Sequence, residues 1–117
     1  KGLEHKFDLI ICHDVIEHIK DKATFLSNLP KYINPEGIIF MSFPAWQMPF
    51  GGHQQICKSK IISHFPFIHL LPAPIYKGIL KFSGESTGCI EELLSIKETK
   101  TSIELFEKLV HEKPLQL

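Results

Sequence analysis

Arginine is absent from this chain of 117 residues, so all 13 of its strongly basic side chains are lysines. The absence excludes the paired guanidinium hydrogen bonds that proteins use to read phosphate groups and guanine bases. Thirteen Asp and Glu residues balance the lysines, and the formal net charge is zero. Because no basic face is evident either, we do not expect a nucleic-acid partner.

The chain has few cysteines, and their spacing argues against two further classes of protein, the disulfide-rich domains and the zinc ribbons. The three cysteines lie far apart in the chain, at Cys12, Cys57 and Cys89. An odd number without a Cys-x-x-Cys pair favours neither a disulfide framework nor a zinc ribbon. A protein of the reducing cytoplasm is the simplest interpretation.

No set of histidines and cysteines has the spacing of a standard metal site. Two loose sets remain, which are His53 with Cys57, and Cys12 with His13 and His18. Zinc needs three or four convergent ligands, and these sets offer two or three at unusual spacing. We therefore expect no metal site.

Long apolar runs are missing as well. The richest apolar stretch, 61–82, is interrupted by Pro66, Pro72 and Pro74, and we expect no membrane-spanning helix. No signal-peptide pattern follows Lys1. With 44% hydrophobic and 22% charged residues, the composition is that of an ordinary globular protein, not of a disordered or collagen-like chain.

The first third of the chain has the pattern of a β-strand, a helix and a second β-strand. Residues 7–12 and 38–43 are short apolar runs, typical of strands covered on both faces of a parallel sheet. Between them, Asp21 can cap a helix that reaches Ile33, with Pro30 kinking its last turn. Residues 34–37 (Asn-Pro-Glu-Gly) predict a turn. We expect a right-handed βαβ unit and hence an α/β protein.

The rest of the chain predicts loops and short helices. In order, we expect a loop over 44–52, a helix beginning within 53–60, proline-punctuated helices over 61–82, a linker over 83–88, and a helix over 89–97. Thr101 and Glu104 fit a capping box at the start of a last helix. Two strands alone do not make a stable parallel sheet, so we expect the chain to be part of a longer domain.

Residues 7–43 resemble the second half of a class I S-adenosylmethionine-dependent methyltransferase. The matching sequence segments are Phe-Asp-Leu-Ile at 7–10, Asp-Val-Ile-Glu-His-Ile at 14–19, and Pro-Glu-Gly at 35–37. The resemblance implies a partial Rossmann-like methyltransferase fold, with the family's fourth and fifth strands, flanking helices and a helical insertion on the substrate side. It implies one domain fragment over 1–117, divided into a βαβ unit (1–43), a substrate-side loop and lid (44–88), and C-terminal helices (89–117).

The same resemblance implies that S-adenosylmethionine is the cofactor. In the family, the segment after the fourth strand lines the cofactor, which here gives His13, Asp14, Val15 and His18. The alternative is that these are ordinary strand-end residues, and that Glu17 with His18 forms a structural pair. The family's glycine-rich loop is not in this sequence, so this piece alone is expected to bind the cofactor weakly or not at all.

His53 is the candidate catalytic base. Methyl transfer to a hydroxyl or amine is helped by removal of a proton, and an imidazole suits this step. Gly51 and Gly52 would allow close approach before it, and Gln54 and Gln55 offer neutral hydrogen bonds to a substrate. Trp46 also falls on this substrate side. The alternative for His53 is a loop histidine that contacts substrate or caps a helix.

Apolar residues outside the βαβ unit have three interpretations. They could form a lid over a hydrophobic substrate, a contact in a homo-oligomer, or packing that covers the sheet. The expected activity is methyl transfer from S-adenosylmethionine to an oxygen, nitrogen or carbon of a small molecule. The alternative is a non-catalytic methyltransferase-like interaction module or an inactive fragment. A dinucleotide enzyme of another kind fits residues 14–18 less well.

Overall fold

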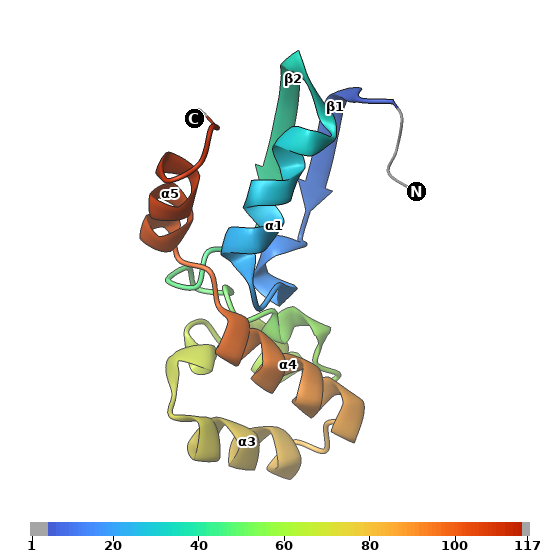
Figure 1. Cartoon of the computed structure of the whole chain (residues 1–117). Coiled ribbons are helices and arrows are strands. Elements are labelled where there is room, and N and C mark those ends of the chain that lie inside the picture. The colour runs from blue at the N-terminus through green and yellow to red at the C-terminus, as the bar shows by residue number, and fades with distance from the viewer. Residues whose placement is uncertain (1–4, 116–117) are drawn as a thin grey trace. The chain divides into compact units, whose positions relative to one another are not determined.

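The computed structural model describes residues 5–115 and divides the chain into two compact units. Unit 1 comprises residues 1–43 and 103–117, and unit 2 comprises residues 44–102. Unit 1 holds a two-stranded parallel sheet with helices, and unit 2 consists of helices and loops (Figure 1). The predicted mixed α/β class is confirmed.

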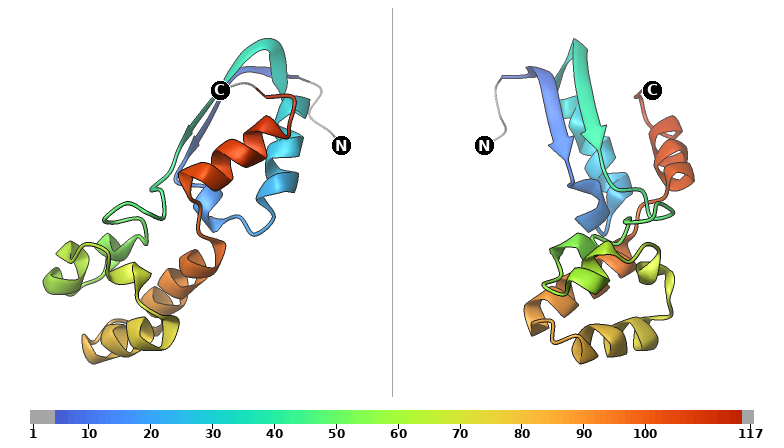
Figure 2. Two further views of the ribbon diagram at one scale, coloured as in Figure 1. Left: turned by 90° about the vertical axis from the view of Figure 1, so that its left-hand side faces the viewer. Right: turned by 180° about the vertical axis from the view of Figure 1, so that it is seen from behind.

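The sheet of unit 1 is made by β1 (Phe7–His13) and β2 (Ile33–Ser42), which run parallel. Their carboxyl-terminal halves pair without interruption, from Leu9 opposite Ile38 to His13 opposite Ser42. The connection between them contains α1 (Lys22–Asn28), which lies along the sheet (Figure 2). The predicted strand–helix–strand order is therefore confirmed.

Only one face of this sheet is covered by the described residues. The covered face packs against α1 and α5 (Ile103–His111), around Leu26 and Val110. The opposite face leaves five large apolar side chains exposed, which are Phe7, Leu9, Ile11, Ile38 and Phe40. Parallel strands are normally covered on both faces. The expectation that this sheet has further neighbours in a longer domain stays a prediction.

Helix α1 begins where the sequence predicts it. Asp21 precedes the helix, with Oδ1 accepting the Thr24 backbone N–H (2.9 Å) and Oδ2 accepting the Thr24 hydroxyl (2.7 Å). The helix is shorter than expected, because its α-helical part ends at Asn28. Pro30 lies in a separate 3₁₀ turn, Leu29–Lys31, since proline fits the first positions of a helical turn better than its interior.

The Asp21 cap should make part of the stability of the protein depend on pH. Hydrogen bonds from the Thr24 hydroxyl and backbone N–H lower the pKa of Asp21 below its ordinary value. A carboxyl whose pKa is lower in the folded state contributes stability above its unfolded pKa and loses that contribution as the pH falls through the folded value. Asp21→Ala in the full-length protein should therefore lower the denaturation midpoint at pH 7 more than at pH 3.

Urea denaturation at both pH values measures this difference. Asp21→Asn is the matched control, because asparagine still caps a helix but does not titrate in this range. Its loss of stability should be smaller than that of Asp21→Ala at each pH but should show the same difference between pH 7 and pH 3, because neither variant carries the titrating carboxyl group. Equal losses at pH 3 and pH 7 for Asp21→Ala would show that the charge on this carboxylate contributes nothing.

The turn predicted at residues 34–37 is wrong. These residues belong to β2, which starts at Ile33 instead of Ile38. The register is irregular there, because Ile33 pairs with Phe7 while Ile38 already pairs with Leu9. Gly37 fits this distortion, since a Cβ atom on it would lie 2.5 Å from the Ile33 side chain. The proline and glycine thus mark an irregular strand segment and not a chain reversal.

Unit 2 contains short helices separated by prolines and serines, as predicted. They are a 3₁₀ helix at Gln54–Ile56, α2 (Lys60–His64), a 3₁₀ helix at Ile68–Leu70, α3 (Ala73–Phe82) and α4 (Thr87–Thr99). Ser59 caps α2 and Ser86 caps α4 through their side-chain oxygens. Tyr76, Leu80 and Leu93 are almost fully buried in the core between these helices.

The predicted last helix is present as α5, but its cap differs. The helix begins at Ile103, so that Ser102 and not Thr101 directly precedes it. The hydroxyl of Thr101 is buried and has no hydrogen-bond partner among residues 5–115. The expectation that Thr101 caps this helix is therefore wrong. Phe106 on the apolar face of α5 packs against Phe43, with ring centroids 5.0 Å apart.

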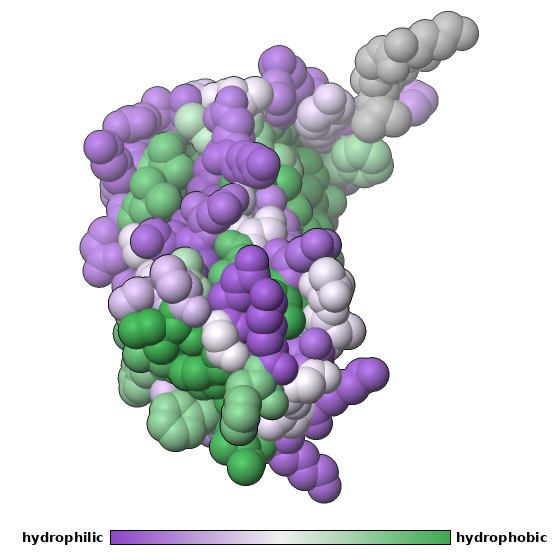
Figure 3. All heavy atoms as spheres, turned by 90° about the horizontal axis from the view of Figure 1, so that it is seen from below, coloured by the Kyte–Doolittle hydropathy of each residue, from purple (hydrophilic) through white to green (hydrophobic). Residues whose placement is uncertain are grey.

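Unit 2 exposes several large apolar side chains. They include Ile61 and Phe65 near α2, and Ile75 and Phe82 on α3. Figure 3 views the molecule from the end at which α3 is drawn in Figure 1, and it shows apolar residues gathered on that face. Whether they form a lid, an oligomer contact or ordinary packing stays a prediction. Within the described part of the chain, no helix is both long enough and apolar enough to cross a membrane.

Candidate functional site

The carboxyl ends of β1 and β2 are tied together by side-chain and backbone hydrogen bonds. His13 and Ser42 are the last residues of the two strands and are paired in register. The His13 Nδ1 and Ser42 Oγ atoms are hydrogen-bonded at 2.5 Å, and the Asp14 N–H donates to the Ser42 carbonyl at 2.9 Å. Open α/β sheets bind their ligands beyond this edge. The structure thus brings the predicted residues His13 and Asp14 to the expected edge.

Asp14 has an unusual backbone conformation at this edge. Its φ angle is +52°, in the left-handed region that residues other than glycine rarely adopt, although aspartate tolerates it better than most. Such strain is often found at binding sites. The Asp14 carboxylate lies 3.4 Å from His13 Nε2, and both side chains are substantially exposed. A carboxylate and an imidazole therefore face solvent side by side, where they can bond a hydroxyl or an amine.

The residues after Asp14 form a 3₁₀ turn, Ile16–His18, that begins after the half-buried Val15. Glu17 is 1% exposed, whereas the side chain of His18 is 41% exposed and its Nε2 atom lies 3.9 Å from the Glu17 carboxylate. Nearby, Lys22 donates to the Ile19 carbonyl at 2.6 Å. Burial lowers the pKa of Lys22, and the charge of Glu17 opposes this shift. Because Glu17 is buried, we interpret it as a residue that supports the local structure and not as a ligand contact. The more exposed His18 can contact a ligand.

The predicted substrate-side residues of unit 2 differ in accessibility. His53 is half-buried and also left-handed, with φ +60°, and it precedes the 3₁₀ helix Gln54–Ile56. Gln55 is exposed, whereas Gln54 is fully buried. The Gln54 Nε2 atom donates to the Pro49 carbonyl (3.0 Å) and the Phe65 carbonyl (3.3 Å). In this structure Gln54 holds the loop together, and its role in substrate contact stays a prediction.

Trp46 is held by a buried histidine that the sequence did not single out. His69 donates from Nε2 to the Trp46 carbonyl (2.8 Å), and its ring packs edge-on against the indole, with centroids 4.6 Å apart. Burial lowers the pKa of His69, which favours the neutral ring. Lys97 and Lys100 place their ammonium groups 5.3 and 5.6 Å from the indole centroid. The indole is therefore fixed from several sides.

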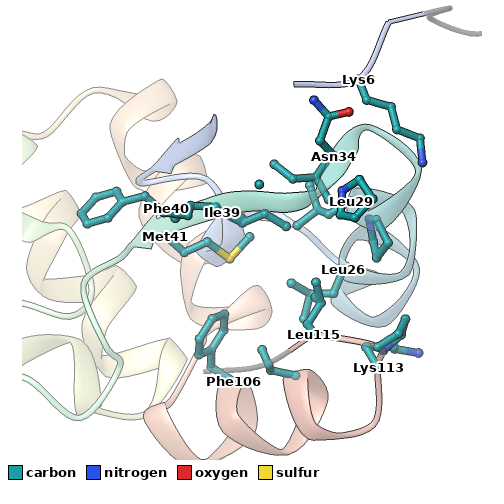
Figure 4. A pocket seen from close by; sticks show the side chains of 17 residues that line it. Lys6, Leu26, Leu29, Asn34, Ile39, Phe40, Met41, Phe106, Lys113 and Leu115 are labelled. Atoms are coloured by element: carbon teal, nitrogen blue, oxygen red, sulfur yellow. The ribbon is translucent and has the colours of Figure 1, made fainter. Parts of the chain in front are cut away.

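A large apolar groove in unit 1 does not contain the candidate residues. It has a volume of about 1120 Å³ and lies between β2, α1 and α5 (Figure 4). Its lining includes Leu26, Met41, Phe106 and Leu115, with Lys113 at its margin. None of His13, Asp14, Val15 and His18 lines it. The strand-end edge that holds the candidate residues is therefore separate from this groove.

The chain is similar to known methyltransferases over a third to a half of its length. Residues 3–41 match a family described as "Methyltransferase domain". The chain is 29% identical over 63 residues to the ubiquinone biosynthesis O-methyltransferase of Pasteurella multocida, which covers 50% of the chain and 26% of that protein. It is 31% identical over 58 residues to the protein of the same name from Histophilus somni, covering 45% and 24%.

A similar match from Rickettsia bellii is 41% identical over 39 residues, covering 33% of the chain and 16% of that ubiquinone biosynthesis O-methyltransferase. The chain thus spans about a quarter or less of the curated relatives that it matches. No solved structure matches it significantly. The segment that matches the family contains β1, α1 and nearly all of β2, and with them the four candidate residues of the strand-end edge.

Proposed function

We propose that residues 3–41, which match a methyltransferase domain family, are part of a class I S-adenosylmethionine-dependent methyltransferase, and that the full-length protein methylates a hydroxyl group of a small molecule. The observation that carries the proposal is the edge at the carboxyl ends of β1 and β2. Its residues His13 and Asp14 lie within the segment that matches the family. The choice of oxygen as the methyl acceptor rests on the names of the relatives, which are O-methyltransferases.

The strand-end residues suit part of the proposed cofactor. S-adenosylmethionine carries an ammonium group and ribose hydroxyls, and the exposed Asp14 carboxylate and His13 imidazole can accept hydrogen bonds from such donors. His18 and the backbone at Val15 would complete this side of the binding site. The glycine-rich loop that the family uses for cofactor contact is not in this sequence, so these residues hold only part of the ligand.

The proposed chemistry divides between the cofactor and His53. When bound, S-adenosylmethionine supplies a methyl group on a positively charged sulfur. The group that would take up this methyl is a hydroxyl of the substrate, which must also lose a proton. The His53 imidazole accepts the proton that the hydroxyl loses. Trp46 and Gln55 would orient the substrate, because alignment of the reacting atoms is the main requirement of such a methyl transfer.

Calorimetry with S-adenosylhomocysteine tests the cofactor half of the proposal. The full-length protein should bind this product, and Asp14→Asn should weaken the binding about tenfold, because one charge-assisted hydrogen bond becomes a neutral one. Asparagine also tolerates the left-handed backbone at this position. The loss should therefore reflect the charge and not misfolding.

Asp8→Asn is the matched control for this titration. Asp8 is an exposed aspartate of β1 that accepts a hydrogen bond from Asn34 near the opposite end of the strand. Its variant should bind S-adenosylhomocysteine like the unaltered protein. Absence of binding heat in the full-length protein would refute the cofactor assignment. Unchanged affinity in Asp14→Asn would remove Asp14 from the binding site but leave the family assignment in place.

A further inference from the structure

Two cysteines and a glutamate converge in unit 2, outside the segment that matches the family. The sulfur atoms of Cys57 and Cys89 and a carboxylate oxygen of Glu85 all lie within 4.8 Å of one another. Cys57 follows the 3₁₀ helix Gln54–Ile56, whereas Glu85 directly precedes the Ser86 cap of α4 and Cys89 lies in its first turn. The fold brings them together although α2 and α3 separate them in the sequence.

The Glu85 carboxylate is fixed in its position. The residue is 8% exposed, and its two oxygens accept backbone N–H groups from Lys58 (Oε2, 3.0 Å) and Ser59 (Oε1, 2.9 Å). These two hydrogen bonds hold both carboxylate oxygens in a fixed orientation. A carboxylate has room for about four hydrogen-bond donors, and acceptor capacity therefore remains on the side of the cysteines.

The two thiols are placed as a metal ion would require. Cys57 is buried in the core, and the half-buried Cys89 gives access from solvent. Buried cysteines commonly act as small apolar groups, but here both sulfurs lie beside a buried charged carboxylate. The three groups come from separate segments and supply two sulfur donors and one oxygen donor. Cysteine thiolates and carboxylate oxygens are both donors that zinc accepts in proteins.

We propose that Cys57, Cys89 and Glu85 bind one Zn²⁺ ion, with a water molecule as the fourth ligand on the Cys89 side. Zinc–sulfur bonds of about 2.3 Å and zinc–oxygen bonds of about 2.0–2.2 Å place tetrahedral ligands about 3.5–3.8 Å apart. The observed limit of 4.8 Å therefore requires a contraction of at most about 1.3 Å between any two ligand atoms. On binding, both thiols release their protons to solvent, and three anionic ligands surround the dication.

The proposed ion would act on the fold of unit 2, although with three protein ligands and a water it differs from the four-ligand structural zinc sites. It would tie the segment at Cys57 to the start of α4, and so stabilise the part of unit 2 that follows His53. The site has three protein ligands from one unit, and its existence does not depend on the proposed methyl transfer. Failure of the methyltransferase assignment would leave this inference intact, and the reverse also holds.

Cobalt substitution tests the site directly. The full-length protein is reduced, stripped with a chelator and titrated with Co²⁺, which gives a sulfur-to-metal charge-transfer band when thiolates coordinate it. We expect this band to saturate at one equivalent and to disappear on addition of one equivalent of Zn²⁺. Cys89→Ser should weaken Zn²⁺ binding at least about tenfold, because it removes one of three protein ligands while changing a half-buried side chain by one atom.

Cys12→Ser is the matched control, because Cys12 is the remaining cysteine and lies in β1 of unit 1. It should leave the band and the stoichiometry unchanged. Circular dichroism of every variant shows whether it is folded, and Cys89→Ala serves as a second variant if Cys89→Ser is not. The proposal is overturned if the reduced, folded protein gives no charge-transfer band, if a folded Cys89 variant keeps the full band, or if Cys12→Ser abolishes it.

Discussion

Replacing His53 with asparagine should lower the methyl-transfer turnover of the full-length protein by about 100-fold or more, because a positioned general base contributes about 10²–10⁴-fold to a rate. Asparagine removes the imidazole but adopts the left-handed backbone readily, and His53 has a φ angle of +60°. The variant should therefore fold normally and bind S-adenosylhomocysteine with unchanged affinity. The turnover number under saturating substrate, together with calorimetry of this product, measures both effects.

His64→Asn is the matched control for this experiment. His64 is an exposed histidine of α2, whose Nδ1 atom is hydrogen-bonded to the Lys60 carbonyl at 2.9 Å. Its variant should keep full turnover. If His53→Asn keeps the turnover of the unaltered protein, His53 is not the base.

The elements that the sequence predicted well are those with strong local signals. The apolar runs at 7–12 and 38–43 gave the two parallel strands, since few other structures accommodate such short continuous runs beside polar ends. The side chain of Asp21 begins α1 by bonding the nearby Thr24 backbone N–H, which depends on a few adjacent residues only. Prolines likewise separated the short helices of unit 2.

The errors arose where contacts distant in the sequence overrode a local signal. Asn34 and Pro35 are common in turns, but pairing with β1 and the Asn34 side-chain bond to Asp8 (2.6 Å) hold this segment in an irregular strand. Thr101 fits the pattern of a capping residue, yet its backbone carbonyl accepts the Trp46 N–H at 2.8 Å and the helix begins later. Neither partner is visible from the residues next to the motif.

The candidate site was predictable only in part, for the same reason. His13 and Asp14 follow a recognisable strand, and parallel pairing necessarily brings that strand end to Ser42. The buried His69 beside Trp46, and Glu85 beside Cys57, belong to partners more than 20 residues apart that meet only after the helices of unit 2 pack. The one local signal was Gly51-Gly52. It predicted that another group approaches this loop closely, but it did not identify that group as His69.

That close approach explains why replacing Gly52 with alanine should be among the most damaging single changes in unit 2. A Cβ atom on Gly52 would lie 2.2 Å from the His69 Cβ and 2.6 Å from its Cγ. His69 is fully buried and fixed by its bond to the Trp46 carbonyl, so it has little room to move. Overpacking of this kind costs about 1–3 kcal/mol, and we expect about 3 kcal/mol of lost unfolding free energy.

Gly78→Ala separates this steric effect from the general effect of adding a methyl group. Gly78 lies within α3, and a Cβ atom there would meet nothing within 4 Å. Alanine in a helix interior is about 0.5–1 kcal/mol more favourable than glycine, so this variant should be more stable than the unaltered protein. Urea denaturation of the full-length protein measures both changes. Because Gly52 does not have a positive φ angle, unaltered stability in Gly52→Ala would mean that His69 does not pack against it as described.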